Sequence, residues 1–567
     1  MPEGQRNSKR RPAGVRFASR TRPQSGSNKG NGKYIFFIGG TGARACRAFL
    51  HSCAAGAIKD EEIKIMLLDA DTTNAACMEC EELYQLYSHQ HEMFRKMAQN
   101  SRKKRNATTA FCCNVTMYHG KAVSPVEVGN RRLKLIVPGQ HKNGRKALKW
   151  FYEKEEREQD LLNGFYAHPN IGCIFFQNFN TQTGMSRSPE EPNALFRSCL
   201  GDIVNDLRVG DVQITIIGSL FGGTGAAGIP TVLHVIQDYC EANAAQNLSR
   251  LHFGGVLIAP YFKVRPKPSN AGDQDANISV ESDTFLSTTR SALLYYQFQD
   301  VFDRVYLIGK EQMDIICPDY EDGGEEQRNK AHIVELLSVM AAKDFLTGGN
   351  ICKDPRDKIQ ILMLKPMQNS EDLKNRFDWY SDCFDRDFWA LADMLRAQVL
   401  LETEIYPYVE GKENGSSGMS QWYKVYGMDS YNLEQDDDDL SIMRRYTEDF
   451  LDWMYDLQYR YVDFDTDEME WNPEVSLCGR VMGDVKERMV ERIENSDSYA
   501  HQEKDLESIL SKFNTLVETA QNMGYVVDKA FLLLSALGVV PQPIAAMQLG
   551  GLFKHLFDLV QDKREIR

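Results

Sequence analysis

The sequence predicts an α/β fold, in which a doubly wound, mostly parallel sheet is followed by a mixed, largely helical C-terminal region. Three observations support this prediction. Short apolar runs, such as residues 34–38, are typical of strands that are buried on both faces. Two of these runs lead into glycine-rich turns and then into helical patterns. The alternation of strand and helix patterns continues from residue 33 to about residue 350.

Composition excludes several classes of protein. The chain has 567 residues, of which 42% are hydrophobic and 26% charged, so it can form a large core and more than one domain. Its formal net charge of −14 argues against nucleic-acid binding by the chain as a whole, and we expect no specific nucleic-acid partner. No apolar run reaches the roughly 18 residues of a membrane-spanning helix, and we expect a cytoplasmic protein. The 13 scattered cysteines indicate reduced thiols.

Residues 1–32 are predicted to be a basic disordered tail. Residues 1–33 contain nine Lys or Arg residues and one acidic residue, Glu3, with almost no large apolar side chains. Such a segment cannot bury enough surface to offset its chain entropy. It is either a solubilising tail or a contact for an acidic partner or a membrane surface.

The first strand–helix–strand unit begins at residue 33. A strand over 34–38 leads into a glycine turn over 39–42 and a helix over 44–57. A second strand over 63–68 ends in Asp69 and Asp71. This order of elements is typical of the start of a parallel, doubly wound sheet.

Residues 75–163 have a mixed, weakly periodic pattern, and we interpret them as an insertion at the rim of the sheet. They include a group of candidate metal ligands, namely Cys77, Cys80, His89, His91, Cys112 and Cys113. The spacing of these residues matches no standard zinc site. We therefore interpret the cysteines as core and helix-face residues and expect no metal there.

The strand–turn–helix unit recurs further along the chain. A strand over 212–217 leads into a second glycine turn over 218–230 and then into an apolar helix over 231–239. The alternation continues with strands over 251–259 and 304–308 and helices over 284–299 and 331–346. We therefore assign residues 33–350 to one α/β domain.

Residues 351–567 are predicted to form a C-terminal domain with a helical tail. A strand pattern over 359–364 precedes long helical patterns over 371–404 and 440–461. The apolar tail over 506–560 also has a helical pattern. Its apolar side chains form either a core or helical hairpin, or a surface for another subunit or a bilayer.

The two glycine turns are the candidate chemical sites. A glycine turn between a buried strand and a helix lets backbone N–H groups approach an anion at the positive end of the helix dipole. Such a turn also serves tight packing of a helix on a sheet, without any ligand. Neither turn has the P-loop pattern or the full dinucleotide fingerprint. Since parallel strands present their helix starts along one edge, two such turns can hold one polyphosphate together.

The second turn resembles the signature loop of the tubulin/FtsZ superfamily. Residues 221–230 read Phe-Gly-Gly-Thr-Gly-Ala-Ala-Gly-Ile-Pro, and the family loop reads Gly-Gly-Gly-Thr-Gly-[Ser/Thr]-Gly. Residues 39–42 are similar to the first glycine loop of the family, and residues 69–74 are similar to its acidic loop. Residues 167–172 resemble the loop that faces the terminal phosphate in FtsZ. The four loops occur in the order of the family.

This resemblance implies GTP or GDP with Mg²⁺ as cofactors, and it implies a set of binding residues. Those residues are Gly39, Gly40, Thr41, Gly42, Asp69, Asp71, Asn74, Ala167, His168, Gly222, Gly223, Thr224, Gly225, Ala226 and Asn329. Asn329 corresponds by position to the family residue that stacks on guanine. Thr224 is the expected hydroxyl contact to phosphate, and a helix-capping role is the alternative.

The resemblance also implies head-to-tail self-assembly, because members of the family complete the GTPase site with an acidic loop from the neighbouring subunit. Asp354 and Asp357 are the catalytic candidates, although they are shifted relative to the family pattern and Cys352 stands at its first acidic position. Phe221, Ala226 and Ala227 also depart from the signature. The sequence therefore leaves open a non-polymerising, nucleotide-gated binding or signalling module. A dinucleotide oxidoreductase is a third, weaker interpretation.

Overall fold

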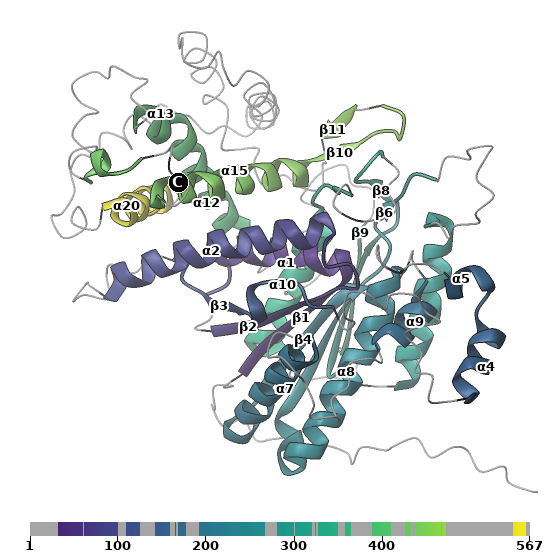
Figure 1. The fold of residues 1–567 in the computed structure, drawn as a ribbon. Helices are drawn as coiled ribbons and strands as arrows, with labels where there is room; N and C mark the ends of the chain where they lie inside the picture. The colour runs from purple at the N-terminus through teal and green to yellow at the C-terminus, as the bar shows by residue number, and fades with distance from the viewer. Residues whose placement is uncertain are drawn as a thin grey trace, which may run out of the picture.

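The fold was derived from a computed structural model (Figure 1). The structure describes residues 32–59, 62–99, 109–124, 142–158, 161, 165, 168–176, 192–266, 280–299, 301–319, 324, 327–349, 358–364, 388–409, 426–432, 435, 438–466, 468–471 and 548–562. The predicted tail over 1–32 lies outside these residues except for residue 32.

Seven parallel strands form the main sheet, which confirms the predicted α/β class. They are β1 (Gly32–Ile38), β2 (Glu62–Leu68), β3 (Asn114–Met117), β4 (Val212–Ser219), β5 (Leu251–Ile258), β7 (Arg304–Lys310) and β9 (Ile359–Leu364). Their order is β3-β2-β1-β4-β5-β7-β9, and each neighbouring pair is parallel. The order reverses between β1 and β4, since the chain leaves β1 toward one side of the sheet and leaves β4 toward the other. Such a switch point opens a crevice at the carboxyl ends of the strands.

Helices cover both faces of the sheet (Figure 1). On one face lie α1 (Gly39–Ala54), α2 (Ala75–Gln99) and α10 (Ile333–Asp344), which share one apolar cluster. On the other lie α6 (Pro169–Phe176), α7 (Pro192–Val209) and α8 (Gly223–Ala244), which form a second cluster. Leu293 and Tyr296 of α9 (Phe285–Gln299) pack against this second cluster, whereas Phe285 at the start of α9 belongs to the first. The chain crosses from β1 to β2 and from β4 to β5 in opposite directions along the sheet. Because such crossovers are right-handed, α1 and α8 leave the switch point toward opposite faces.

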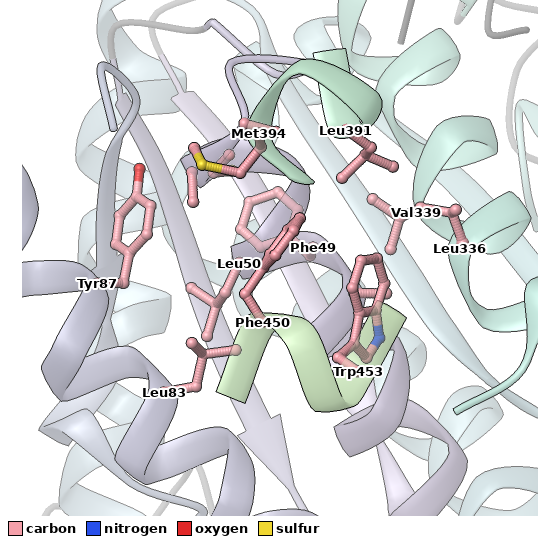
Figure 2. Packing of buried hydrophobic residues seen from close by; sticks show 14 of the residues in the cluster. Phe49, Leu50, Leu83, Tyr87, Leu336, Val339, Leu391, Met394, Phe450 and Trp453 are labelled. Carbon is pink, nitrogen blue, oxygen red and sulfur yellow. The ribbon is translucent and has the colours of Figure 1, made fainter. Parts of the chain in front are cut away.

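Helices from the region after residue 350 pack on α1, α2 and α10. They are α12 (Phe388–Leu400), α15 (Asp439–Gln458) and α20 (Gln548–Asp562). Figure 2 shows Phe49 of α1, Leu83 of α2, Leu391 of α12 and Trp453 of α15 directed into one core. Strand β9 also comes from this region and lies in the main sheet. The boundary at residue 350 remains a prediction, although the described residues on its two sides share a sheet and a core.

A second, four-stranded sheet has the order β11-β10-β8-β6. Its strands are β6 (Phe262–Lys263), β8 (Asp314–Ile315), β10 (Tyr459–Tyr461) and β11 (Met469–Trp471). The remaining helical segments are α4 (Lys142–Phe151), α5 (Lys154–Glu158), α13 (Tyr406–Val409), and the short η2 (Tyr118–Gly120), η3 (Ala245–Arg250), η4 (Ser282–Thr284), η5 (Phe345–Gly349), η9 (Leu401–Ile405) and η10 (Met428–Ser430). No helix within the described residues is both long enough and apolar enough to cross a membrane.

Three elements differ from the sequence prediction. Part of the expected insertion over 75–163 forms α2 and the edge strand β3, so that this part belongs to the sheet and its covering layer. The helix expected over 231–239 already begins at Gly223 and continues through Pro230. The helix expected over 440–461 ends at Gln458, because Tyr461 pairs with Ile315 of β8. Of the helix patterns over 371–404 and 506–560, only residues 388–404 and 548–560 are described.

Candidate functional site

The two glycine turns lie in contact at the switch point between β1 and β4. Helix α1 begins at Gly39, immediately after β1, and α8 begins at Gly223, with three residues between it and the end of β4 at Ser219. Gly39 has a φ of +78°, which favours glycine. A Cβ atom on Gly39 would lie 3.2 Å from the backbone nitrogen of Gly225 and 3.2 Å from the Cβ of Thr224. The starts of α1 and α8 are therefore neighbours, as expected from the sequence.

Several glycines in these turns are required by packing. A Cβ atom on Gly42 would lie 2.9 Å from the carbonyl carbon of Phe37, and one on Gly225 would lie 2.5 Å from the carbonyl oxygen of Ser219. Both contacts are with backbone atoms, which cannot move aside. Part of the glycine pattern therefore has a packing role, which is the alternative that the sequence leaves open.

Gly40 differs from these glycines because a Cβ atom there would meet nothing within 4 Å. It is half-buried and is the second residue of α1. The start of α1 thus faces open space beside the start of α8. Packing does not explain a glycine at this position, whereas close approach of a ligand to the backbone does.

The first turns of α1 and α8 are suited to an anion. Neither N-cap, Ile38 for α1 or Gly222 for α8, makes a side-chain capping hydrogen bond. Neither first turn contains an acidic residue. The first N–H groups of a helix have no partner within the helix, and the helix dipole adds partial positive charge there. Two such ends side by side form a favourable environment for phosphate groups.

The acidic loop after β2 reaches the start of α8. The Thr224 hydroxyl donates to Oδ1 of Asp69 at 3.3 Å, and the Asn74 side-chain amide donates to Oδ2 of Asp69 at 3.1 Å. Asp71 accepts from the backbone N–H of Gly324 at 3.1 Å. The structure thus brings together Asp69, Asp71 and Asn74 with Thr224, although they come from distant parts of the chain.

Burial and the neighbouring Asp71 raise the pKa of Asp69 to about 7. Asp69 and Asp71 are each only 3% exposed. Two carboxyl groups this close cannot both ionise at low cost unless a cation compensates their charge. Carboxylates are also the side-chain ligands that Mg²⁺ prefers. A bound cation would therefore lower the cost of ionising this buried carboxyl pair.

Residues 168–172, at the start of α6, lie next to the first turn of α8. A Cβ atom on Gly172 would lie 2.8 Å from the carbonyl oxygen of Gly223 and 2.6 Å from the Cβ of Ala227, so α6 packs tightly on the first turn of α8. His168 is half-buried at the start of α6, with its Nδ1 3.8 Å from Oε1 of Glu156. Ala167 lies outside the described residues.

The remaining predicted site residues are Asn329 and the catalytic candidates Asp354 and Asp357. Asn329 is half-buried in the loop before α10, five residues after Gly324, whose N–H binds Asp71. A base-stacking role for Asn329 stays a prediction. The catalytic candidates Asp354 and Asp357 lie outside the described residues, so that the hydrolysis hypothesis stays a prediction as well.

The sequence reasoning missed a buried ion pair beside the first glycine turn. Nε of Arg44 in α1 lies 2.6 Å from Oε1 of Glu335 in α10, and the Arg44 side chain also donates to the hydroxyls of Tyr261 at 2.9 Å and Thr41 at 3.3 Å. The Tyr261 hydroxyl donates to Glu335 at 2.6 Å. The spacing of Thr41 and Arg44 on one helix face was readable from the sequence, but their distant partners were not.

This ion pair continues into a second buried group of charges. The Glu335 side chain accepts from the backbone N–H of His332 at 3.0 Å, and Nε2 of His332 contacts Asp314 at 3.0 Å. Lys310 and Arg460 also pair with Asp314. Although burial opposes its ionisation, the hydrogen bond and charge of His332 hold the pKa of Asp314 well below its usual range. A continuous polar path therefore joins the first glycine turn to the small sheet.

The cysteines of α2 are core residues, as expected. Cys77 and Cys80 are fully buried in the apolar cluster of α1 and α2. His89 instead contacts Asp439 at 2.6 Å, and His91 contacts the carbonyl oxygen of Phe111 at 2.8 Å. Within the described part of the chain, no group of three or more His, Cys, Asp or Glu residues could hold a metal ion.

Comparisons of the chain with models of protein families, with curated proteins and with solved structures each found no match.

Proposed function

We propose that this protein binds a guanine nucleotide with Mg²⁺ in the crevice between β1 and β4, in the manner of the tubulin/FtsZ superfamily that its loops resemble. The observation that carries the proposal is the contact between the two glycine turns. A Cβ atom on Gly39 would lie 3.2 Å from the backbone nitrogen of Gly225, whereas a Cβ atom on Gly40 would meet nothing within 4 Å. Two uncapped helix starts therefore border one space that can receive a polyphosphate.

Each part of the site has a role in this proposal. The backbone N–H groups of Gly40 and Thr41 on one side, and of Thr224 and Gly225 on the other, would bind phosphate oxygens. Asp69 and Asp71 would contribute to the Mg²⁺ shell, which phosphates and water complete. When bound, Mg²⁺ neutralises charge on the terminal phosphates.

Self-assembly and hydrolysis are part of the same proposal. We propose that subunits associate head to tail, that the nucleotide lies between them, and that Asp354 or Asp357 of one subunit orients the attacking water in the site of the next. A head-to-tail contact of this kind propagates into a filament. The second candidate is a nucleotide-gated module that neither polymerises nor hydrolyses. Ala226, Ala227 and the displaced aspartates Asp354 and Asp357 favour it.

Nucleotide binding is tested with a Gly40→Asp variant. Its side chain enters the open space and places a carboxylate where the phosphates would lie, so we expect GTP affinity in Mg²⁺ to fall about 100-fold or more, equivalent to about 2.7 kcal/mol. An acidic residue in the first turn of a helix is favourable to the helix, so the variant should fold. Titration calorimetry with GTP, GDP and ATP measures the affinities.

Gly201→Asp is the matched control. Gly201 lies in α7, and a Cβ atom there also meets nothing within 4 Å. We expect this variant to bind GTP like the wild type. If the wild-type protein shows no affinity for any of the three nucleotides, or if the Gly40→Asp variant binds GTP as tightly as the wild type, the proposed pocket is wrong.

Light scattering with GTP and Mg²⁺ separates the two candidate functions. A filament-forming GTPase scatters light and releases phosphate, whereas a switch module binds GTP as a monomer. With Asp357→Ala, retained binding and lost turnover support catalysis across a subunit interface. Unchanged turnover in both Asp354→Ala and Asp357→Ala rejects that assignment.

A further inference from the structure

A strongly basic stretch stands out in this acidic chain. Residues 101–150 contain twelve Lys or Arg residues and one acidic residue, Glu127, which gives a local charge of +11, from twelve minus one. The whole chain has a formal charge of −14. The stretch ends in helix α4, whose ten residues include four cationic side chains and no acidic one.

The end of α4 presents two aromatic rings to solvent. Trp150 is 78% exposed and Phe151 is 75% exposed, the two largest exposed fractions among the exposed large apolar side chains of the described residues. Lys146 and Lys149 beside them are also exposed. We name these four residues, Lys146, Lys149, Trp150 and Phe151, the α4 tip. Exposed rings of this size are unfavourable in water and mark a contact surface.

Helix α4 is held firmly on the body of the protein. Leu148 is 6% exposed and belongs to the apolar cluster on the α8 face of the sheet. The Tyr152 hydroxyl donates to the carbonyl oxygen of Asn170 in α6 at 2.9 Å, and the Asn170 side chain donates to Glu156 in α5 at 3.0 Å. The α4 tip therefore projects from a fixed base.

We infer that the α4 tip docks on an anionic phospholipid bilayer. Lipid interfaces take up Trp and Phe rings at the level of the headgroups, and Lys side chains next to the rings pair with anionic lipid phosphates. The α4 tip combines both kinds of side chain, since it has two exposed rings and two lysines. Nucleic acid is a less favourable partner, because a long polyanion would extend beyond the α4 tip along a chain whose net charge is −14.

Sedimentation with vesicles tests this inference on the full-length protein. Vesicles of phosphatidylcholine mixed with phosphatidylserine should bind the wild type at low salt, and vesicles of phosphatidylcholine alone should bind it far less. Lys146→Gln/Lys149→Gln should weaken binding roughly fivefold per lysine. Trp150→Ala/Phe151→Ala should weaken it about tenfold or more, since both rings lose their apolar contact with lipid. The basic residues at the N-terminus are the same in all variants, so a difference in binding between variants comes from the α4 tip.

Leu286→Ala/Leu294→Ala on α9 is the matched control, because both side chains are exposed, by 67% and 46%. This variant should bind vesicles like the wild type. Brominated lipids should quench the fluorescence of the wild type on binding, and Trp150→Phe should lose most of that quenching. Equal binding of the Trp150→Ala/Phe151→Ala variant and the wild type would overturn the inference. So would equal binding to neutral vesicles, or binding of single-stranded oligonucleotides without binding of vesicles.

Discussion

Asp69 is the site residue whose ionisation the fold opposes most clearly. It is 3% exposed, accepts a hydrogen bond from Thr224 and lies next to Asp71. Its pKa of about 7 means that the folded protein keeps a proton that the unfolded chain releases near pH 4. A cation bound next to Asp69 would favour its ionised form and offset the unfavourable effects of burial and of Asp71. The raised pKa of Asp69 is therefore relevant to the proposed Mg²⁺ binding.

This gives a pH-dependent prediction for the ligand-free protein. Between about pH 4 and pH 7 the folded state holds more protons than the unfolded state, so the Asp69 contribution to the free energy of unfolding falls as pH rises, by on the order of 4 kcal/mol in total. Asp69→Asn removes this contribution. We expect its free energy of unfolding to fall less steeply with pH than that of the wild type over this window.

Urea unfolding at several pH values measures both slopes. The slope is the quantity to compare, because the asparagine amide must face one of the donors that Asp69 accepts from, which offsets the stability of the variant at every pH. Parallel slopes for the two proteins would show that Asp69 titrates normally.

At the scale of elements, the glycine turns combine two roles that the sequence pattern cannot separate. Gly42 and Gly225 allow α1 and α8 to begin directly against β1 and β4, whereas Gly40 faces open space. The difference depends on which backbone atoms lie opposite each glycine. A pattern of glycines therefore predicts that other atoms approach the backbone closely. It does not show whether those atoms belong to a neighbouring strand or to a ligand.

A matched pair of alanine variants tests this distinction. Gly225→Ala places a methyl group 2.5 Å from the Ser219 carbonyl oxygen, and we expect a loss of about 1–3 kcal/mol in stability from overpacking. Gly40→Ala meets no atom and should raise stability by up to about 1 kcal/mol, since alanine is the better helix former. Thermal unfolding followed by circular dichroism measures both changes. Equal effects of the two substitutions would contradict the assigned roles.

At the scale of the whole molecule, the C-terminal helices stabilise the layer that supports the first glycine turn. Trp453 of α15 is 1% exposed, and its ring lies 4.5 Å from that of His51 in α1. Leu552 and Phe553 of α20 belong to the same cluster as α1 and α2. Helix α1 is therefore packed between the main sheet and helices from the far end of the chain.

Removal of one side chain from this core should destabilise the whole protein. Trp453→Ala leaves a large cavity, and we expect a loss of about 3–5 kcal/mol. Circular dichroism and intrinsic fluorescence should report one common transition at a lower temperature, because the described helices on both sides of residue 350 share the core. Leu286→Ala on the exposed side of α9 should leave the transition unchanged. Two separate transitions, of which only one moves, would indicate that the helices after residue 350 unfold independently.

Much of the main sheet could be predicted from local patterns in the sequence. The strands near residues 34–38, 63–68, 212–217 and 359–364 agree with the structure, because uninterrupted apolar runs between turns are typical of strands buried on both faces. The glycine turns, Asp69 and Asp71 were also readable, since turn chemistry depends on neighbouring residues. Local patterns failed where a distant partner decides the structure, as at Tyr461, which lies in β10 and pairs with Ile315 of β8.

Local residue patterns were enough to show that the chain alternates strands and helices and that glycines and carboxylates follow particular strands. The folded structure was needed to show that Gly39 lies against Gly225, that Thr224 reaches Asp69, and that Arg44 pairs with Glu335, which is 291 residues away. The difference comes from the range of the interactions. Backbone propensity and periodicity act over a few residues, whereas packing and buried ion pairs join groups that become neighbours only when the sheet has formed.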